Sequence, residues 1–361
     1  MAASPHLLFV PGGGREGVGE SIRASVLAEA ALERWPGARI GFLTGDRHVG
    51  LADEAFERHV VPGRVSRNVA AVNVLLRELA PDVVVFDCRG RGSQIGCAAR
   101  TGARTVYVAV QPHILRRALR LGRLRWLDQI WIVHRPVDAA LTRSQRLRLR
   151  LARGTEVVFL DTVFPPPDAA RLEALRLELP LGDGPYVLFA PGGGGYTCGG
   201  RPAAEIFAEA AQRLHRAIGI TCVAVMGPLY PHPPPRLDGV TVIDSLPPKA
   251  MIDLVSGTHL LVCGGGGLVS QGLANARVCV AAPAGSSDQP ERIRALADEG
   301  LIEPAPLDAK AIAARAAALL EDEACQEAIR ARIARRRLCN GLDAAVDQLA
   351  RLLERRPGAP P

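Results

Sequence analysis

Residues 259–283 read HLLVCGGGGLVSQGLANARVCVAAP, and this stretch decides the fold class. Two short apolar runs, at 260–263 and 278–282, flank four glycines and a segment with helical periodicity. A buried strand, a tight turn, a helix and a second strand together form the βαβ unit of a parallel sheet. The stretch therefore predicts an α/β protein.

The same alternation of apolar runs and helical segments extends along the whole chain of 361 residues. Apolar runs predict strands at His6–Val10, Arg39–Leu43, Val83–Asp87, Thr105–Ala109, Gln129–Val133, Val157–Leu160, Tyr186–Ala190, Ile220–Met226, Val240–Ile243, Leu260–Cys263 and Val278–Ala282. The length favours two domains, at roughly 150 residues per domain. We therefore expect two Rossmann-like, doubly wound parallel sheets that face a cleft.

The segment from Leu179 to Pro185 holds two prolines and two glycines in seven residues, a composition typical of a linker. It predicts an N-terminal domain at 1–178 and a C-terminal domain at 186–335. The remaining residues, 336–361, are expected to form a C-terminal helix and a frayed tail.

The formal charge of +7 is concentrated in one segment. Residues 113–154 contain eleven arginines against only two aspartates, which indicates a local anionic partner. With four tyrosines and three tryptophans in the chain, little is left for base stacking, so nucleic acid is not expected as a partner. Arg116, Arg120 and Arg123 share one helical stripe, which suits either an anionic membrane surface or a solvated face over a leucine core.

The eight cysteines form no CxxC pair, and no apolar run approaches the roughly 18 residues of a membrane span. The first residues, MAASPHLLFV, lack the basic start of a signal peptide. These features predict a reduced, cytoplasmic protein that is soluble or peripheral on the inner face of the membrane.

Three glycine clusters, at 12–19, 192–195 and 264–267, each follow a predicted strand and precede a helix. Glycine lets backbone N–H groups approach a phosphate, and the helix N-terminus adds positive charge. A single cluster of this kind is as well explained by a tight turn, but three in corresponding places favour an anionic ligand. The sequence has no P-loop motif and no HxH or HExxH cluster, so neither a cofactor nor a catalytic metal is expected.

Residues 259–283, followed by Ser287-Asp288-Gln289, resemble the donor-binding region of GT-B glycosyltransferases of the MurG type. The resemblance covers about residues 186–320. The N-terminal stretch from Gly17 to Arg23 resembles the opening loop of these transferases and of PseG-like nucleotide-sugar hydrolases.

The resemblance implies a nucleotide-sugar donor, a UDP-sugar by preference, bound by the C-terminal domain. The diphosphate would be surrounded by Gly192, Gly193, Gly194, Gly195, Tyr196, Gly265, Gly266, Gly267 and Leu268. Asp288 and Gln289 would bind the sugar hydroxyls. Ser245, Leu246 and Met251 would contact the nucleobase. Ser270 and Gln271 complete the set, with Gln271 replacing the glutamate that commonly binds the ribose.

The N-terminal domain would bind the acceptor, a small molecule or a lipid-linked one, with Gly17, Gly19, Arg23 and His113 as contacts. Glu20 stands where the opening loop of the family usually has the histidine proposed as base. A glutamate with a raised pKa can take that role, although it can also simply support a helix start. Asp87, at the end of a predicted strand, is the competing base. His113 is a third, weaker candidate.

These observations predict an inverting, metal-independent glycosyltransferase. A nucleotide-sugar hydrolase or epimerase of the same fold remains the enzymatic alternative. A module that binds a nucleotide-sugar without turnover is the non-enzymatic one, because Glu20 and Gln271 both depart from the family pattern.

Overall fold

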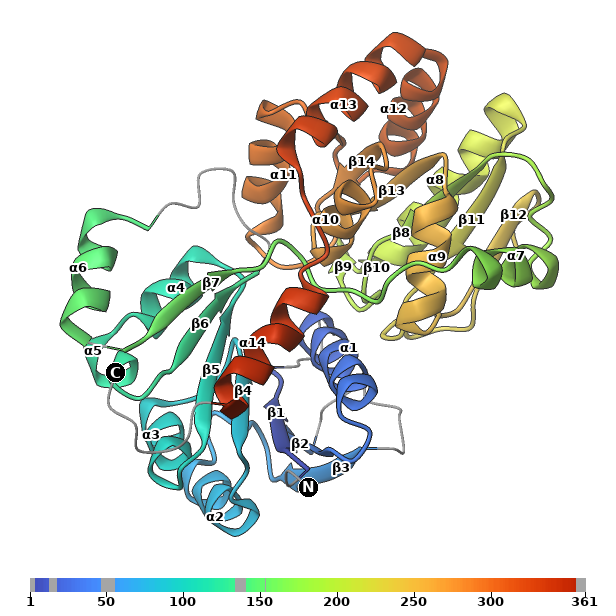
Figure 1. Ribbon diagram of the computed structural model, residues 1–361. Helices are drawn as coiled ribbons and strands as arrows, with labels where there is room; N and C mark the ends of the chain where they lie inside the picture. The colour runs from blue at the N-terminus through green and yellow to red at the C-terminus, as the bar shows by residue number, and fades with distance from the viewer. Residues whose placement is uncertain (1–3, 13–17, 47–55, 134–140, 153, 355–361) are drawn as a thin grey trace. The chain divides into compact units, whose positions relative to one another are not determined.

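The computed structural model describes residues 4–12, 18–46, 56–133, 141–152 and 154–354, and it divides the chain into two compact units (Figure 1). Unit 1 comprises residues 1–14, 20–163 and 341–361. Unit 2 comprises residues 164–340 and the short segment 15–19. Each unit is an α/β domain built on its own sheet, as the sequence predicts.

Unit 1 contains, among its described residues, a sheet of seven parallel strands in the order β3-β2-β1-β4-β5-β6-β7. The strands are β1 (His6–Val10), β2 (Arg39–Gly45), β3 (Glu57–Val61), β4 (Val83–Asp87), β5 (Arg104–Ala109), β6 (Gln129–Ile132) and β7 (Glu156–Phe159). The helices are α1 (Gly19–Arg34), α2 (Val69–Leu79), α3 (Gly92–Arg100), α4 (Pro112–Ala118), α5 (Leu121–Leu124), α6 (Arg143–Ala152) and α14 (Leu342–Glu354).

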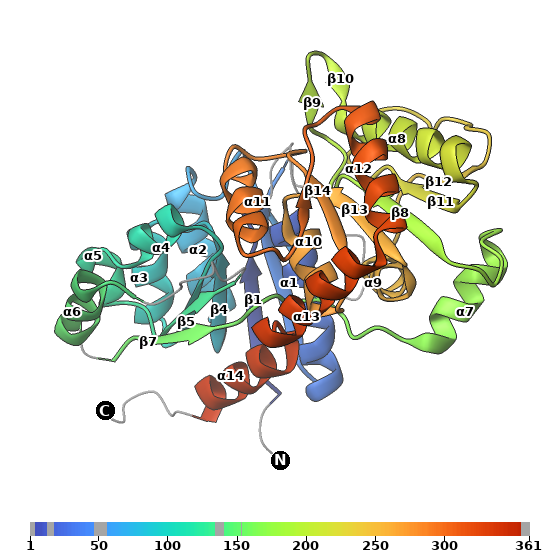
Figure 2. The same cartoon turned by 90° about the horizontal axis from the view of Figure 1, so that it is seen from above.

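The central strands β1 and β4 of unit 1 are buried along their whole length because both faces of the sheet are covered. Leu7 and Phe9 of β1 pack in one cluster with α1 and α14, whereas Leu8 and Val10 pack in a second cluster with α2 and α3. Figure 2 shows α14 and the helices α2 and α3 on opposite sides of this sheet. The alternation of side chains along a strand thus produces the two layers of a doubly wound domain.

Unit 2 contains, where the structure describes it, a sheet of six parallel strands in the order β12-β11-β8-β13-β14-β15 and a short β9–β10 hairpin. The strands are β8 (Tyr186–Ala190), β9 (Thr197–Cys198), β10 (Arg201–Pro202), β11 (Thr221–Val225), β12 (Val240–Ile243), β13 (Leu260–Gly264), β14 (Cys279–Ala282) and β15 (Glu303–Pro304). The helices are α7 (Ala169–Glu178), α8 (Ala203–Ile218), α9 (Pro248–Gly257), α10 (Gly267–Ala274), α11 (Gln289–Asp298), α12 (Ala309–Glu321) and α13 (Glu323–Arg336).

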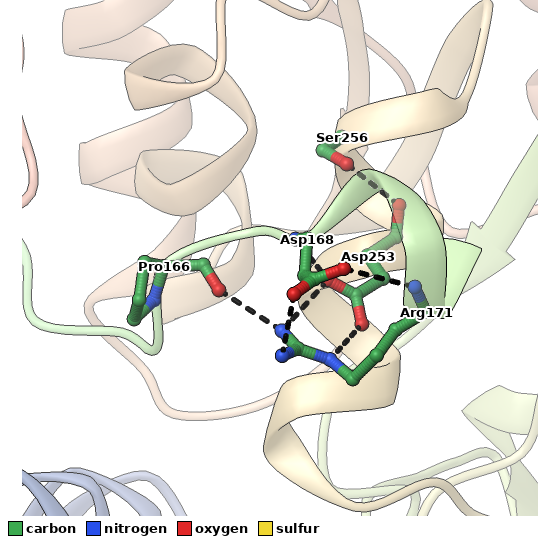
Figure 3. Close-up of polar contacts among 5 residues, drawn as sticks. All are labelled: Pro166, Asp168, Arg171, Asp253 and Ser256. Carbon is green, nitrogen blue, oxygen red and sulfur yellow. Dashed lines mark hydrogen bonds and ion pairs between the residues drawn. The ribbon is translucent and has the colours of Figure 1, made fainter. Parts of the chain in front are cut away.

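One buried carboxylate holds the start of α7 to α9 (Figure 3). Asp253, which is fully buried, accepts the backbone N–H of Asp168 at 2.7 Å and Nε of Arg171 at 2.8 Å. The Arg171 guanidinium also donates to the carbonyl of Pro166 at 3.1 Å. Because these bonds fix residues 166–171 on unit 2, the chain must pass from unit 1 to unit 2 before residue 166.

The chain leaves unit 1 between Val163 and Phe164, not at the segment 179–185 that the sequence suggested as the linker. That segment is a turn inside unit 2, between α7 and β8, and its Leu181 is buried in the core of unit 2. The chain returns between Asn340 and Gly341, so α14 folds with unit 1. The residues after 354 lie outside the described part of the chain.

The arginine stripe predicted from residue 113 onward does not lie on one helix. α4 ends at Ala118, Arg120 is extended with φ −72° and ψ 130°, and α5 begins at Leu121. Leu119 and Leu124 are both fully buried, although they would lie about 140° apart on a continuous helix. Breaking the helix therefore lets both leucines reach the core.

Candidate functional site

Each sheet has one place where the strand order reverses. In unit 1 the order runs outward from β1 through β2 to β3, and then restarts on the other side at β4. In unit 2 the same reversal lies between β8 and β13. Ligands of open α/β sheets bind outside the carboxyl ends of the strands at such switch points. A ligand is therefore expected outside the ends of β1 and β4 in unit 1 and of β8 and β13 in unit 2.

A buried ion pair lies at the switch point of unit 1. Asp87, the last residue of β4, is 2% exposed, and Arg23 of α1 is 5% exposed. Nε of Arg23 donates to Oδ2 of Asp87 at 2.8 Å, and Nη2 donates to Oδ1 at 2.6 Å. Both carboxylate oxygens of Asp87 are thus occupied by one guanidinium, and the arginine that we expected at the substrate has an internal partner.

Glu20 lies one turn before Arg23, in the first turn of α1, and is half-buried. Burial raises the pKa of the Glu20 carboxyl, and the negative charge of Asp87 raises it further, while Arg23 opposes this shift. A carboxylate whose pKa is raised toward neutrality is a better proton acceptor at physiological pH. A carboxylate in the first turn of α1 also complements the positive end of the helix dipole.

The turn after Asp87 has an unusual backbone. Cys88 has φ +59° and Gly90 has φ +124°, and the carbonyl of Cys88 accepts a hydrogen bond from the hydroxyl of Tyr107 at 3.2 Å. A non-glycine residue in the left-handed region persists only where its surroundings fix it. The turn therefore holds the end of β4, and with it Asp87, in one conformation.

The other predicted residues of unit 1 are more open. His113 is exposed near the start of α4, which follows β5. Gly19 is the exposed first residue of α1. Gly17 lies outside the described residues.

The first glycine loop of unit 2 follows β8 and interlocks with the turn after β11. A side chain at Gly194 would lie 2.3 Å from the carbonyl oxygen of Met226, and one at Gly227 would lie 2.4 Å from that of Gly192. Gly192 and Gly194 also have positive φ, +108° and +81°. The identity of Gly194 is therefore explained by close backbone packing alone. Gly193, Gly195 and Tyr196 are half-buried in the same loop.

The second glycine loop joins β13 to α10 at the switch point of unit 2. Gly266 precedes α10, and Gly267 and Leu268 open it with no acidic residue in the first turn. The N-terminal N–H groups of such a helix can receive an anion. Ser270 and Gln271 are half-buried further along α10.

The predicted sugar-binding residues, Asp288 and Gln289, contact the protein itself. Oε1 of Gln289 accepts the N–H of Gly265 at 3.1 Å and that of Ala284 at 2.9 Å, which uses both lone pairs of this oxygen. Oδ2 of Asp288 accepts Nη2 of Arg292 at 2.6 Å. The N–H of Gly265, expected at the diphosphate, is thus already bonded.

Arg292 belongs to this group, although the sequence reasoning did not select it. Its Nη1 donates to the carbonyl of Gly265 at 3.0 Å, and burial lowers the pKa of its guanidinium while Asp288 raises it. The spacing of Asp288 and Arg292 by four residues at a helix start was a signal for this pairing.

The residues expected to contact the nucleobase of the donor follow β12, which lies two strands away from β8. Ser245 is exposed, whereas Leu246 and Met251 are half-buried against the core of unit 2. Apart from Asp288 and Gln289, the predicted donor residues therefore follow β8, β12 and β13, whose carboxyl ends lie at the same edge of the sheet.

Among the residues that the structure describes, no three His, Cys, Asp or Glu side chains gather as a metal-binding group. Over the same part of the chain, no helix is long and apolar enough to cross a membrane.

No protein-family model matches the chain, and neither does any curated protein sequence. Solved structures do match over nearly the full length. The spinosyn forosaminyltransferase SpnP is 16% identical with a TM-score of 0.62, over 97% of this chain and 100% of that one. UGT2 of Phytolacca americana, determined with UDP-2-fluoroglucose and pterostilbene, is 13% identical with a TM-score of 0.64, over 98% and 100%.

A structure from Listeria monocytogenes, described as a UDP-N-acetylglucosamine 2-epimerase, is 13% identical with a TM-score of 0.57, over 96% of this chain and 95% of that one. At such identities the likeness concerns the fold and not the activity. Two doubly wound parallel-sheet units, matched along their whole length, show that this chain has the fold of the GT-B glycosyltransferases.

Proposed function

We propose that the protein transfers a sugar from a nucleoside-diphosphate sugar, held by unit 2, to a hydroxyl group of an acceptor held by unit 1. The observation that supports this proposal is that Asp87 ends β4 at the switch point of unit 1, while the turn into α10 follows β13 at the switch point of unit 2. Unit 2 offers a glycine turn and a helix N-terminus there, which suit a diphosphate. Unit 1 offers a half-buried carboxylate, which suits a base.

Glu20 is the base in this proposal. It accepts the proton of the acceptor hydroxyl, whose oxygen then attacks the anomeric carbon while the bond to the diphosphate breaks. One displacement inverts the configuration of that carbon. The N–H groups of Gly266, Gly267 and Leu268 stabilise the charge that develops on the leaving diphosphate, a role that needs no metal.

Asp87 is the positioning partner in this account and not the base. Its two oxygens receive hydrogen bonds from the Arg23 guanidinium, so both already have a partner inside unit 1. Its negative charge instead raises the pKa of Glu20. His113 is exposed and remains a candidate contact for the acceptor.

Asp288 remains the proposed ligand of the sugar hydroxyls, and Gln271 that of the ribose. Ser245, Leu246 and Met251 remain the proposed contacts of the nucleobase of the donor. The cytoplasmic location also stays a prediction.

Hydrolysis or epimerisation of the nucleotide-sugar is the second candidate, favoured by the fold likeness to the Listeria protein. In the hydrolase, water takes the place of the acceptor. In the epimerase, the carboxylate acts on the sugar itself. Binding without turnover is the third outcome.

Calorimetric titration of the full chain with nucleoside diphosphates and their sugars tests the proposal, with uridine donors first. We expect UDP and at least one UDP-sugar to bind, and UDP to be released only when an acceptor is present. Release without acceptor would identify the hydrolase, and isomerisation of the sugar the epimerase. If no nucleotide-sugar binds, the proposal is wrong.

We further propose that the arginine-rich segment contacts an anionic lipid surface through α6 rather than through one stripe along α4 and α5. Leu147 and Leu151, one turn apart on α6, are 56% and 65% exposed. They are accompanied on the same helix by four exposed arginines, Arg143, Arg146, Arg148 and Arg150. Exposed apolar side chains among cations suit the interface of an anionic bilayer. Arg116 and Arg120, which lie earlier in the arginine-rich segment, are also exposed.

Arg123 departs from this pattern, because its guanidinium lies 5.9 Å from the centre of the Tyr107 ring and donates to the Tyr107 hydroxyl at 3.5 Å. We therefore expect substitution of Arg123 to affect the fold of unit 1 rather than membrane binding.

Sedimentation with lipid vesicles checks the contact through α6. The chain should sediment with vesicles containing phosphatidylglycerol and not with pure phosphatidylcholine, and added salt should release it. The double variant Leu147→Ser/Leu151→Ser should bind the vesicles at least about tenfold more weakly than the parent, because it loses two apolar contacts. Leu177→Ser, at an 88% exposed position of unit 2, is the matched control and should bind like the parent. Equal binding to both lipids would contradict the proposal.

A further inference from the structure

Gln289 is the first residue of α11 and is 7% exposed. Its carbonyl oxygen joins the turns that follow two adjacent strands, because it accepts the N–H of Gly265 after β13 and the N–H of Ala284 after β14. One atom thus satisfies two backbone donors. The side chain thus completes the backbone hydrogen bonding of both turns.

Arg292 lies three residues further along α11 and bonds the other backbone polar group of Gly265, the carbonyl that begins the next peptide unit. Its Nη1 donates to the carbonyl of Gly265 at 3.0 Å, and its Nη2 donates to Asp288 at 2.6 Å. The N–H and the C=O of Gly265 are therefore both held by side chains of α11. Gly265 cannot rotate its peptide groups without breaking a bond to that helix.

Side chains of α11 also fill the space around the turn. A Cβ at Gly265 would lie 2.7 Å from Ile293, and a Cβ at Gly285 would lie 2.1 Å from Nε2 of Gln289. A side chain at either glycine would therefore force the side chain of Ile293 or Gln289 to move. Gly266 is different, because an added Cβ there would meet Nε2 of Gln289 at an ordinary 3.6 Å.

We infer that Gln289 and Arg292 are positioning residues that fix the turn leading into α10, and that Gln289 therefore acts on the diphosphate of the donor rather than on its sugar. This inference rests on the proposed function, since it assigns the diphosphate to the start of α10. The turn lies directly before Gly266 and Gly267, so its conformation sets where their N–H groups point. The phosphate site is thus held in its binding conformation before the ligand arrives.

The inference makes a prediction that separates it from direct sugar recognition. A residue that binds only sugar hydroxyls contributes nothing to the affinity for UDP. A residue that positions the diphosphate-binding turn contributes equally to UDP and to UDP-glucose. Gln289→Met keeps the length of the side chain and removes the accepting oxygen, so both affinities should fall by the same factor, about tenfold.

Two measurements on the full chain test this, with Gln326→Met as matched control. Gln326 is a 4% exposed glutamine of α13 whose Nε2 donates to the carbonyl of Leu319, away from the turn. First, without ligand, hydrogen exchange of the Gly265 and Ala284 amides should be faster in Gln289→Met than in the parent or in the control. Gln289→Glu, which keeps an accepting oxygen, should restore their protection. Second, calorimetry should show equal loss for UDP and UDP-glucose in Gln289→Met and parental affinities in Gln326→Met.

Parental exchange of both amides in Gln289→Met would overturn the inference without touching the proposed function. A loss of affinity confined to UDP-glucose would also overturn it and would return Gln289 to the sugar. A parent chain that binds neither UDP nor UDP-glucose, with the exchange effect present, would instead count against the proposed function and against the link from this turn to a diphosphate.

Discussion

Glu20→Gln should lower kcat by roughly 10²–10⁴-fold, the range that general base catalysis typically supplies. The amide has nearly the shape of the carboxyl group and cannot accept the proton of the acceptor. The dissociation constant of the nucleotide-sugar should stay unchanged, because Glu20 belongs to unit 1 and the donor residues belong to unit 2. Steady-state kinetics together with calorimetry measure the two quantities.

The pH dependence gives a second test of Glu20. Because burial and Asp87 raise its pKa, kcat/KM of the parent should rise with pH through a value above the usual range of glutamate. This rise should be absent in Glu20→Gln. Glu29→Gln, on the same helix, is the matched control and should show parental rates. Parental kcat in Glu20→Gln would remove Glu20 from the mechanism.

The free energy of unfolding should change with pH in the direction opposite to kcat/KM. A carboxyl group whose pKa is higher in the folded chain than in the unfolded chain binds protons more tightly when folded, so it lowers the free energy of unfolding as pH rises. Glu20→Gln removes this penalty. The variant should be more stable than the parent at pH 7, and the difference should vanish once the pH falls below the ordinary pKa of glutamate.

The second large effect concerns the buried pair. Arg23→Met should lower the free energy of unfolding by about 3–5 kcal/mol, because it leaves the carboxylate of Asp87 buried without a counter-charge. Asp87→Asn should cost a similar amount, because Arg23 then loses its partner. Urea denaturation of the full chain, followed by tryptophan fluorescence, measures the midpoint.

A double variant separates the structural from the catalytic role of the pair. Arg23→Met/Asp87→Leu removes both charges, and apolar replacement of a buried pair is often nearly neutral. We expect this variant to unfold near the parental midpoint and to show a lower kcat with a kcat/KM profile shifted to lower pH, because the effect of Asp87, which raises the pKa of Glu20, is larger than the opposing effect of Arg23 and both are lost. Single variants with the parental midpoint would contradict the assignment of a buried pair.

Much of the fold could be predicted because the central strands are buried on both faces. Runs of apolar residues marked β1, β4 and β8, whose residues are all buried, at their observed bounds. The sequence reasoning missed β3, Glu57–Val61, which lies at the edge of its sheet, because three of its five side chains are exposed and it has no continuous apolar run. An edge strand with one side exposed to solvent lacks the continuous apolar run that identifies a buried strand in the sequence.

The sequence indicated the switch points of the two sheets but not the side-chain contacts made there. Strand ends and glycine turns identified the switch points. The pairing of Arg23 with Asp87 joins residues 64 positions apart, and no local pattern records such a contact. In the same way, Gln289 satisfies two backbone donors that only the folded sheet brings together.

The most direct test of the account is a crystal structure of the full chain with UDP. We predict that the diphosphate lies at the carboxyl ends of β8 and β13, within hydrogen-bonding distance of the N–H groups of Gly266, Gly267 and Leu268. Binding of UDP at the end of β4 in unit 1, or no bound UDP at saturating concentration, would contradict the assignment of a nucleotide-sugar site to unit 2.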